Sequence, residues 1–143
     1  MHLQDYAHRL SQIAQTVYLW VIHLSELDRS RREKVALFAE EIAATLARAA
    51  AALINLENGP NDHPSLLAAT RELGRISGYV ETIVAALEGH LDGRKRAGVK
   101  RRLEALEPFD LEAALRRHGA FRNARRLASA EGFFRALADA LRA

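Results

Sequence analysis

Apolar side chains near the start of the chain fall at helical spacing. One register recurs every seven residues, at Leu3, Leu10, Val17 and Leu24. A second register lies three positions later, at Tyr6, Ile13, Trp20 and Leu27. Side chains three, four and seven residues apart share one face of a helix. The two registers therefore predict a bundle helix that ends before the polar stretch 28–33.

The next apolar stripe predicts a second long helix. Its inward positions keep the same spacing, at Val35, Phe38, Ile42, Thr45, Ala49, Ala52 and Leu56. Ser30 and Glu33 have the spacing of a capping box, so we expect Ser30 to cap the first turn. Asn58, Gly59 and Pro60 should end the helix, with Gly59 in the left-handed conformation.

A third helix is predicted from Pro64, because a first helical turn does not need the N–H that proline lacks. Its two apolar registers are Leu66, Leu73, Val80 and Leu87, and Ala69, Ile76 and Ile83. Gly74 and Gly78 lie within it, and each costs up to about 1 kcal/mol relative to alanine. We expect the two glycines to allow close approach of a neighbouring helix, with a hinge or a ligand groove as the alternative.

The C-terminal region is predicted to be helical but more broken. The stretch 92–98 has the composition of an exposed basic loop, and short helices are expected on either side of Pro108. A final helix over about 120–142 should bury Leu127, Ala130, Phe134, Leu137 and Leu141. Arg122, Arg125 and Ser129 point away from that arc.

These elements predict an all-α fold. It is an up-and-down helical bundle of three long helices, with a shorter and more basic C-terminal helical region. The length of 143 residues fits one domain, 1–143, with a candidate sub-boundary near the basic loop at 89–98. The longest apolar runs, 17–22 and 49–54, are far shorter than the roughly 20 residues of a spanning helix. We therefore expect no transmembrane segment and a cytoplasmic protein.

The residue types and their spacings exclude most of the common catalytic and metal sites. There is no cysteine, which excludes disulfides, thiolate zinc sites and a cysteine nucleophile. None of the six histidines follows a glutamate by three residues, as a di-iron bundle requires. No P-loop, nucleophile elbow or arginine–histidine nuclease pair is present. We predict no catalytic residue, metal site or cofactor. The competing hypothesis is an enzyme or small-ligand binder with a pocket near Trp20, Tyr79 and His90.

The distribution of charge along the chain is the feature that points to a binding surface. The net charge of +3 combines −4 over residues 1–93 with +7 over residues 94–143. Basic side chains in the second part form two clusters. The first cluster is Arg94, Lys95, Arg96, Lys100, Arg101 and Arg102. The second cluster is Arg116, Arg117, Arg122, Arg125 and Arg126, with Phe121 near enough to stack on a base.

The leading hypothesis is a non-enzymatic interaction module whose basic surface binds nucleic acid or an acidic protein partner. One alternative is a merely solvated basic face, and another is a purely structural, self-associating bundle. A homo-oligomer is also expected, because apolar residues such as Leu37, Phe38 and Leu46 exceed what one small core hides. For the last helix, a helix-turn-helix with its turn at Ser129 and a membrane-surface helix are weighed as minor alternatives.

Part of the chain resembles two groups of known helical bundles in its layout. In helix lengths and charge, the stretch from Tyr18 to Leu106 is similar to the small four-helix bundles encoded within rRNA intervening sequences. It is also similar to the basic accessory bundles of diversity-generating retroelements. The similarity implies a helical bundle. It carries no residue signature, and residues 109–143 would be an extension.

Overall fold

The computed structural model describes residues 3–23, 28–59, 63–87, 93–94, 97–98, 101 and 119–143. The long elements in these ranges are four α-helices: α1 (Leu3–His23), α2 (Arg29–Asn58), α3 (His63–Ala86) and α6 (Ala120–Arg142). No strand occurs in the described ranges. The predicted all-α fold is confirmed, and the predicted bounds of the last helix agree with those of α6.

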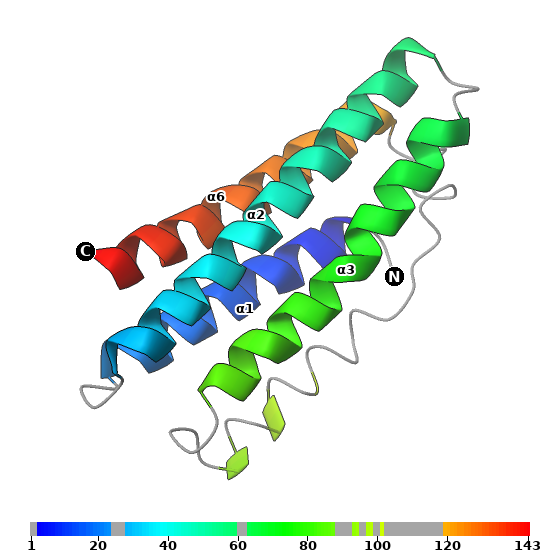
Figure 1. Ribbon diagram of the computed structural model, residues 1–143. Helices are drawn as coiled ribbons and strands as arrows, with labels where there is room; N and C mark the ends of the chain where they lie inside the picture. The colour runs from blue at the N-terminus through cyan, green and yellow to red at the C-terminus, as the bar shows by residue number, and fades with distance from the viewer. Residues whose placement is uncertain are drawn as a thin grey trace.

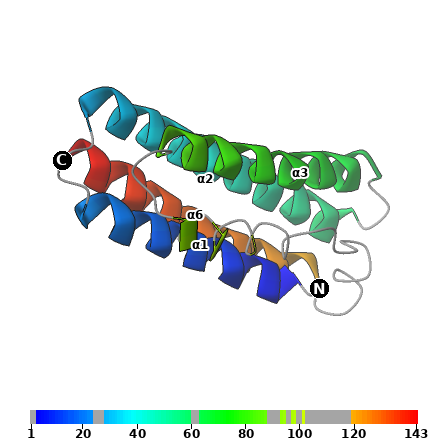
Figure 2. The ribbon, with the colours of Figure 1, turned by 90° about the horizontal axis from the view of Figure 1, so that it is seen from below.

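The helices form two layers, with α2 beside α3 and α1 beside α6 (Figures 1 and 2). α2 runs antiparallel to the other three helices, which share one direction (Figure 1). α6 packs against both α2 and α1, and α3 packs against α2. The C-terminal helix is therefore part of the bundle, where it lies parallel to α1.

The apolar stripes read from the sequence form the core. In α1, Leu10, Ile13 and Val17 are buried, and every predicted inward position of α6 is buried as well. Phe134 of α6 is the largest fully buried side chain among the described residues. Burying one such side chain contributes roughly 1.5–3 kcal/mol, so these stripes hold α6 in place between α1 and α2.

The start of α2 differs from the predicted capping box. The N-cap is Asp28, whose Oδ1 accepts a hydrogen bond of 2.7 Å from the backbone N–H of Arg31. Ser30 lies inside the first turn and is exposed. A carboxylate at the N-cap satisfies a free N–H and also interacts favourably with the positive end of the helix dipole. The prediction that Ser30 caps the helix is wrong, and Glu33 instead contacts Arg142 of α6.

α2 ends where the sequence predicted, but by a different geometry. Gly59 has a φ of −142°, so it does not adopt the left-handed conformation. Its backbone N–H donates to the carbonyl of Asn55, which completes a last helical turn. The expected left-handed cap is therefore wrong.

Gly74 and Gly78 of α3 do not mark a close helix contact. Both are exposed, and within the described part of the chain no atom lies within 4 Å of a Cβ built on either residue. The expectation of close approach is wrong, because the stripe that carries the two glycines faces outward.

The apolar residues expected to drive self-association are mostly internal. Leu46 is fully buried, and Phe38 is partly buried against Tyr79 of α3, with ring centroids 5.9 Å apart. Of the three residues named for this purpose only Leu37 is exposed, at 47%. One core hides more of this stripe than the sequence suggested, because α3 covers the flank of α2.

The stretch expected to be a basic loop is helical wherever it is described. Gly93, Arg94, Ala97 and Gly98 have helical backbone, so the loop prediction is wrong at those residues. Arg101 is helical as well, and there the sequence predicted the short helix that precedes Pro108. The helices predicted on either side of Pro108 lie outside the described residues. Among the helices that are described, none is long and apolar enough to cross a membrane.

Candidate functional site

The first basic cluster is described at two positions. Arg94 and Arg101 are both exposed. The other four members, Lys95, Arg96, Lys100 and Arg102, lie outside the described residues, as do Arg116 and Arg117 of the second cluster. The described part of the predicted surface is therefore concentrated at the start of α6.

α6 begins at a glycine that its backbone requires. Gly119 has a φ of +76°, in the region where a Cβ is strained, and it precedes the first helical residue. The Asn123 side-chain amide donates to the carbonyl of Gly119 at 2.6 Å, which fixes the first turn. No acidic residue lies in that turn. The start of α6 is thus defined locally and is not screened by its own carboxylates.

The structure divides the three described arginines of the second cluster. Arg122 and Arg125 are exposed, whereas Arg126 is partly buried on the side of α6 that faces α1. Phe121 is 56% exposed and lies one helical turn before Arg125, so the two side chains share a face. We call Phe121, Arg122 and Arg125 the α6 basic face.

The arginines of the α6 basic face have no carboxylate partner among the described residues. Further along α6, Arg135 pairs with Glu131 at 2.7 Å. Arg142 bonds Glu33 at 2.9 Å and also bonds Glu40, both on α2. These hydrogen bonds, led by those that Arg142 donates to Glu33, raise the pKa of Arg142 above its usual value. The free arginines and the paired arginines therefore lie at opposite ends of one helix.

The neighbouring helices explain this division. The contacts of Arg142 with Glu33 and Glu40 place the first half of α2 beside the end of α6. The antiparallel course then brings the end of α2 to the start of α6 (Figure 1). Residues 42–56 of α2 contain no Asp or Glu, and neither do residues 6–25, which include most of α1. The described side chains of α1 and of the second half of α2 therefore bring no carboxylate to the start of α6, and the side chains of Asp5 and Glu57, which border these stretches, lie outside the described ones. The stretches without Asp or Glu are visible in the sequence, but only the packing of the helices shows that they lie near the start of α6.

α6 is continuous through the position at which a helix-turn-helix would need its turn. Ser129 is helical and exposed, and the helix runs unbroken from Ala120 to Arg142. The helix-turn-helix hypothesis is therefore wrong for this segment, because the apolar residues on both sides of Ser129 belong to one buried stripe of a single helix.

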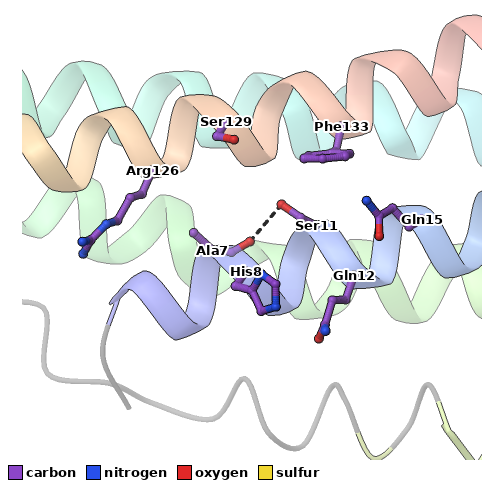
Figure 3. A pocket seen from close by; sticks show the side chains of 8 residues that line it. All are labelled: Ala7, His8, Ser11, Gln12, Gln15, Arg126, Ser129 and Phe133. Carbon is purple, nitrogen blue, oxygen red and sulfur yellow. Dashed lines mark hydrogen bonds between the residues drawn. The ribbon is translucent and has the colours of Figure 1, made fainter.

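The pocket of the competing hypothesis, near Trp20, Tyr79 and His90, falls mostly on side chains outside the described ones. Tyr79 packs on Phe38, and the side chains of Trp20 and His90 lie outside the described residues. A groove of about 520 Å³ lies between α1 and α6 (Figure 3). The groove is lined by Ala7, His8, Ser11, Gln12, Gln15, Arg126, Ser129 and Phe133.

Most of these lining residues were not singled out in the sequence. Their only local signal is the polar strip of α1, in which Ser11, Gln12 and Gln15 lie beside the apolar stripe. In the described part of the chain, no three His, Asp or Glu side chains gather as a metal site would require.

The chain matches no known family model, no curated protein and no solved structure. Its function therefore has to be argued from its own residues.

Proposed function

We propose that this protein is a non-catalytic helical module that binds single-stranded nucleic acid through the α6 basic face. The observation that carries the proposal is the pair of exposed arginines, Arg122 and Arg125, which have no described carboxylate partner and stand beside an exposed aromatic ring. Guanidinium groups bind phosphate oxygens, and an unpaired base can stack on phenylalanine.

The position of Phe121 favours nucleic acid over an acidic protein partner. Its ring is more than half exposed, although burial of such a ring would stabilise the fold. Carboxylates of a protein partner would need only the two arginines. Bases of a single strand would use the ring as well, with base stacking worth about 1–3 kcal/mol per base.

The direct test measures binding of labelled single-stranded RNA and DNA by fluorescence anisotropy, at about 50 and 200 mM salt. Replacing Arg122 and Arg125 by alanine should weaken binding about tenfold at the lower salt and reduce the salt slope by about 2. Each lost arginine removes one phosphate contact and the counterion release that goes with it.

A matched control removes the same charge elsewhere. Lys34 of α2 and Arg71 of α3 are exposed, and in the described ranges neither makes an ion pair. The Lys34→Ala, Arg71→Ala double variant has the same net charge as the Arg122→Ala, Arg125→Ala variant. It should bind like the wild-type protein. Equal losses in the two double variants would mean that binding follows net charge, and would overturn the proposed face.

A single substitution separates nucleic acid from an acidic protein. Phe121→Ala should weaken binding of single strands and leave the salt slope unchanged, because stacking releases no counterions. If Phe121→Ala has no effect and polyglutamate competes as well as RNA does, the site recognises carboxylates and the nucleic-acid proposal is wrong.

A further inference from the structure

The outward face of α2 carries a second, mostly apolar stripe. Its members alternate by three and four positions, so they lie along one side of the helix. We call them the α2 outer stripe: Leu37, Glu40, Ala44, Ala47, Ala51 and Ile54. None of the six is buried, whereas Leu46 and Leu53 on the opposite side are fully buried. In Figure 1, α2 lies between α6 and α3, and no other described helix lies in front of it.

The two large apolar side chains stand at the ends of this stripe. Leu37 is 47% exposed and Ile54 is 44% exposed, although burial of either would be favourable. They lie about 25 Å apart along the helix axis. The residues between them include three alanines, which keep the surface low and let a second helix approach closely. Alanines alone would not identify that helix, but the larger and the charged residues do.

The α2 outer stripe is complementary to a second copy of itself that runs in the opposite direction. With the twofold axis midway between Ala44 and Ala47, these two alanines of opposite copies meet. Leu37 of each copy then lies opposite Ile54 of the other, and Glu40 faces an alanine. A parallel pair would instead set Glu40 against Glu40 of the second copy, which like-charge repulsion disfavours.

The charged residues beside the stripe match in the same antiparallel arrangement. Glu41 and Arg48 lie two helical turns apart on the side of α2 toward α3, where Arg48 donates to Glu72 at 3.0 Å. Glu41 of one copy lies within about 3 Å, along the axis, of Arg48 of the other. Glu41 has no ion pair among the described residues, and no described bond uses Nη1 of Arg48. Each copy therefore offers the charge that the other lacks.

We propose that the protein forms an antiparallel homodimer through the α2 outer stripe. Leu37 and Ile54 close the two ends of the contact, alanines pack at its centre, and Glu41 pairs with Arg48 of the second copy along one edge. One helix from each copy makes a contact at the low end of interface sizes, so monomer and dimer are in equilibrium. The α6 basic face is not part of the stripe, so dimerisation does not depend on the proposed nucleic-acid site.

Sedimentation equilibrium of the full chain measures association directly. The wild-type mass should rise from that of a monomer toward twice that value with concentration. Leu37→Glu should weaken the dimer at least about a hundredfold, because symmetry removes the buried leucine twice. Leu67→Glu on α3 is the control, because Leu67 is 62% exposed and is followed on its face by Arg71 and Gly74. It should dimerise like the wild type. A wild-type monomer at about 1 mM, or equal losses in both variants, would overturn the proposal.

A charge reversal tests the edge of the contact. Glu41→Lys sets like charges side by side at two symmetric places, so it should weaken the dimer about tenfold, and less at high salt. Glu81→Lys on α3 makes the same change in charge and should leave association unchanged. Glu81 is exposed and has no ion pair in the described ranges. Equal effects of the two reversals would show that net charge, and not this pairing, governs association.

Disulfide cross-linking tests the antiparallel register. The chain contains no cysteine, so Leu37→Cys protein mixed with Ile54→Cys protein should give a disulfide-linked dimer on mild oxidation. Leu37→Cys alone should not, because its two sulfurs would lie about 25 Å apart. Equally efficient cross-linking of Leu37→Cys with itself would indicate another pairing and contradict the proposal. The Arg122→Ala, Arg125→Ala protein should dimerise like the wild type, which separates failure of this interface from failure of the α6 basic face.

Discussion

The two ends of α6 use the same residue type for different purposes. At the end of the helix, Arg142 bonds Glu33 and Glu40 and fastens α6 to the start of α2. At the beginning, Arg122 and Arg125 extend into solvent without a described carboxylate nearby. The comparison teaches that a count of arginines does not identify a binding surface. The distribution of acidic residues on the neighbouring helices decides which arginines are structural and which are free.

The largest expected effect is a loss of stability when the buried core side chain of α6, Phe134, is removed. Phe134→Ala should lower the free energy of unfolding by about 3–5 kcal/mol, because it empties a fully buried aromatic site near the middle of α6. Urea denaturation followed by circular dichroism measures this loss. The adjacent Phe133 is partly exposed, so Phe133→Ala serves as the control and should cost far less. Equal losses in the two variants would show that α6 is not packed as described.

The next test removes two arginines from each half of α6 in turn and compares stability with RNA binding. The Arg135→Ala, Arg142→Ala variant removes two charges, as the Arg122→Ala, Arg125→Ala variant does. It breaks ion pairs within α6 and between α6 and α2, so the thermal unfolding midpoint should fall by a few degrees, less than for Phe134→Ala. Binding of single-stranded RNA should be retained.

The opposite pattern is expected at the other end, where Arg122→Ala, Arg125→Ala should bind RNA weakly and keep its unfolding midpoint. Calorimetry together with anisotropy on both proteins checks the two halves of this prediction. If each variant loses stability and binding in the same proportion, the distinction between the two ends of α6 is wrong.

The smallest expected effect comes from Gly132, which lies inside α6 between its two ends. Gly132 is exposed, and no described atom lies within 4 Å of a Cβ built on it. Gly132→Ala should therefore raise the free energy of unfolding by up to about 1 kcal/mol, because alanine favours the helix. Gly74→Ala on α3 should give a similar gain for the same reason. A loss of stability in Gly132→Ala would mean that this surface is covered in the molecule in solution.

The sequence predicted helices well and contacts poorly. The apolar registers of α1, α2, α3 and α6 identified Ile13, Ile42, Ile76 and Leu127 as core positions, and all four are buried. The errors concern the cap of α2 and the surroundings of Gly74. The first depends on which side chain, Asp28 or Ser30, caps the free N–H groups of α2, and the second depends on which face of α3 packs against α2. The spacing of residues along the chain does not determine either outcome.

The candidate site was predicted in part. Arg122 and Arg125 were expected to point outward and do so, whereas Arg126 was placed in the same surface and instead lines the α1–α6 groove. Arg125 and Arg126 are adjacent in the chain, yet the 100° of helical rotation between them turns Arg126 toward α1. Only the presence of α1 on that side places Arg126 in a groove and leaves Arg125 in solvent.

The sequence by itself determined where the helices lie, which faces they bury and where positive charge collects, because helix periodicity is local and amphipathic patterning expresses it directly. Tertiary structure decided that α6 lies parallel to α1 and antiparallel to α2. That pairing sets a carboxylate from residue 33 against a guanidinium from residue 142 and leaves the arginines at the start of α6 without a described carboxylate partner. Coulombic pairing acts over a few ångströms in space, so its outcome depends on which distant segments the packed core brings together.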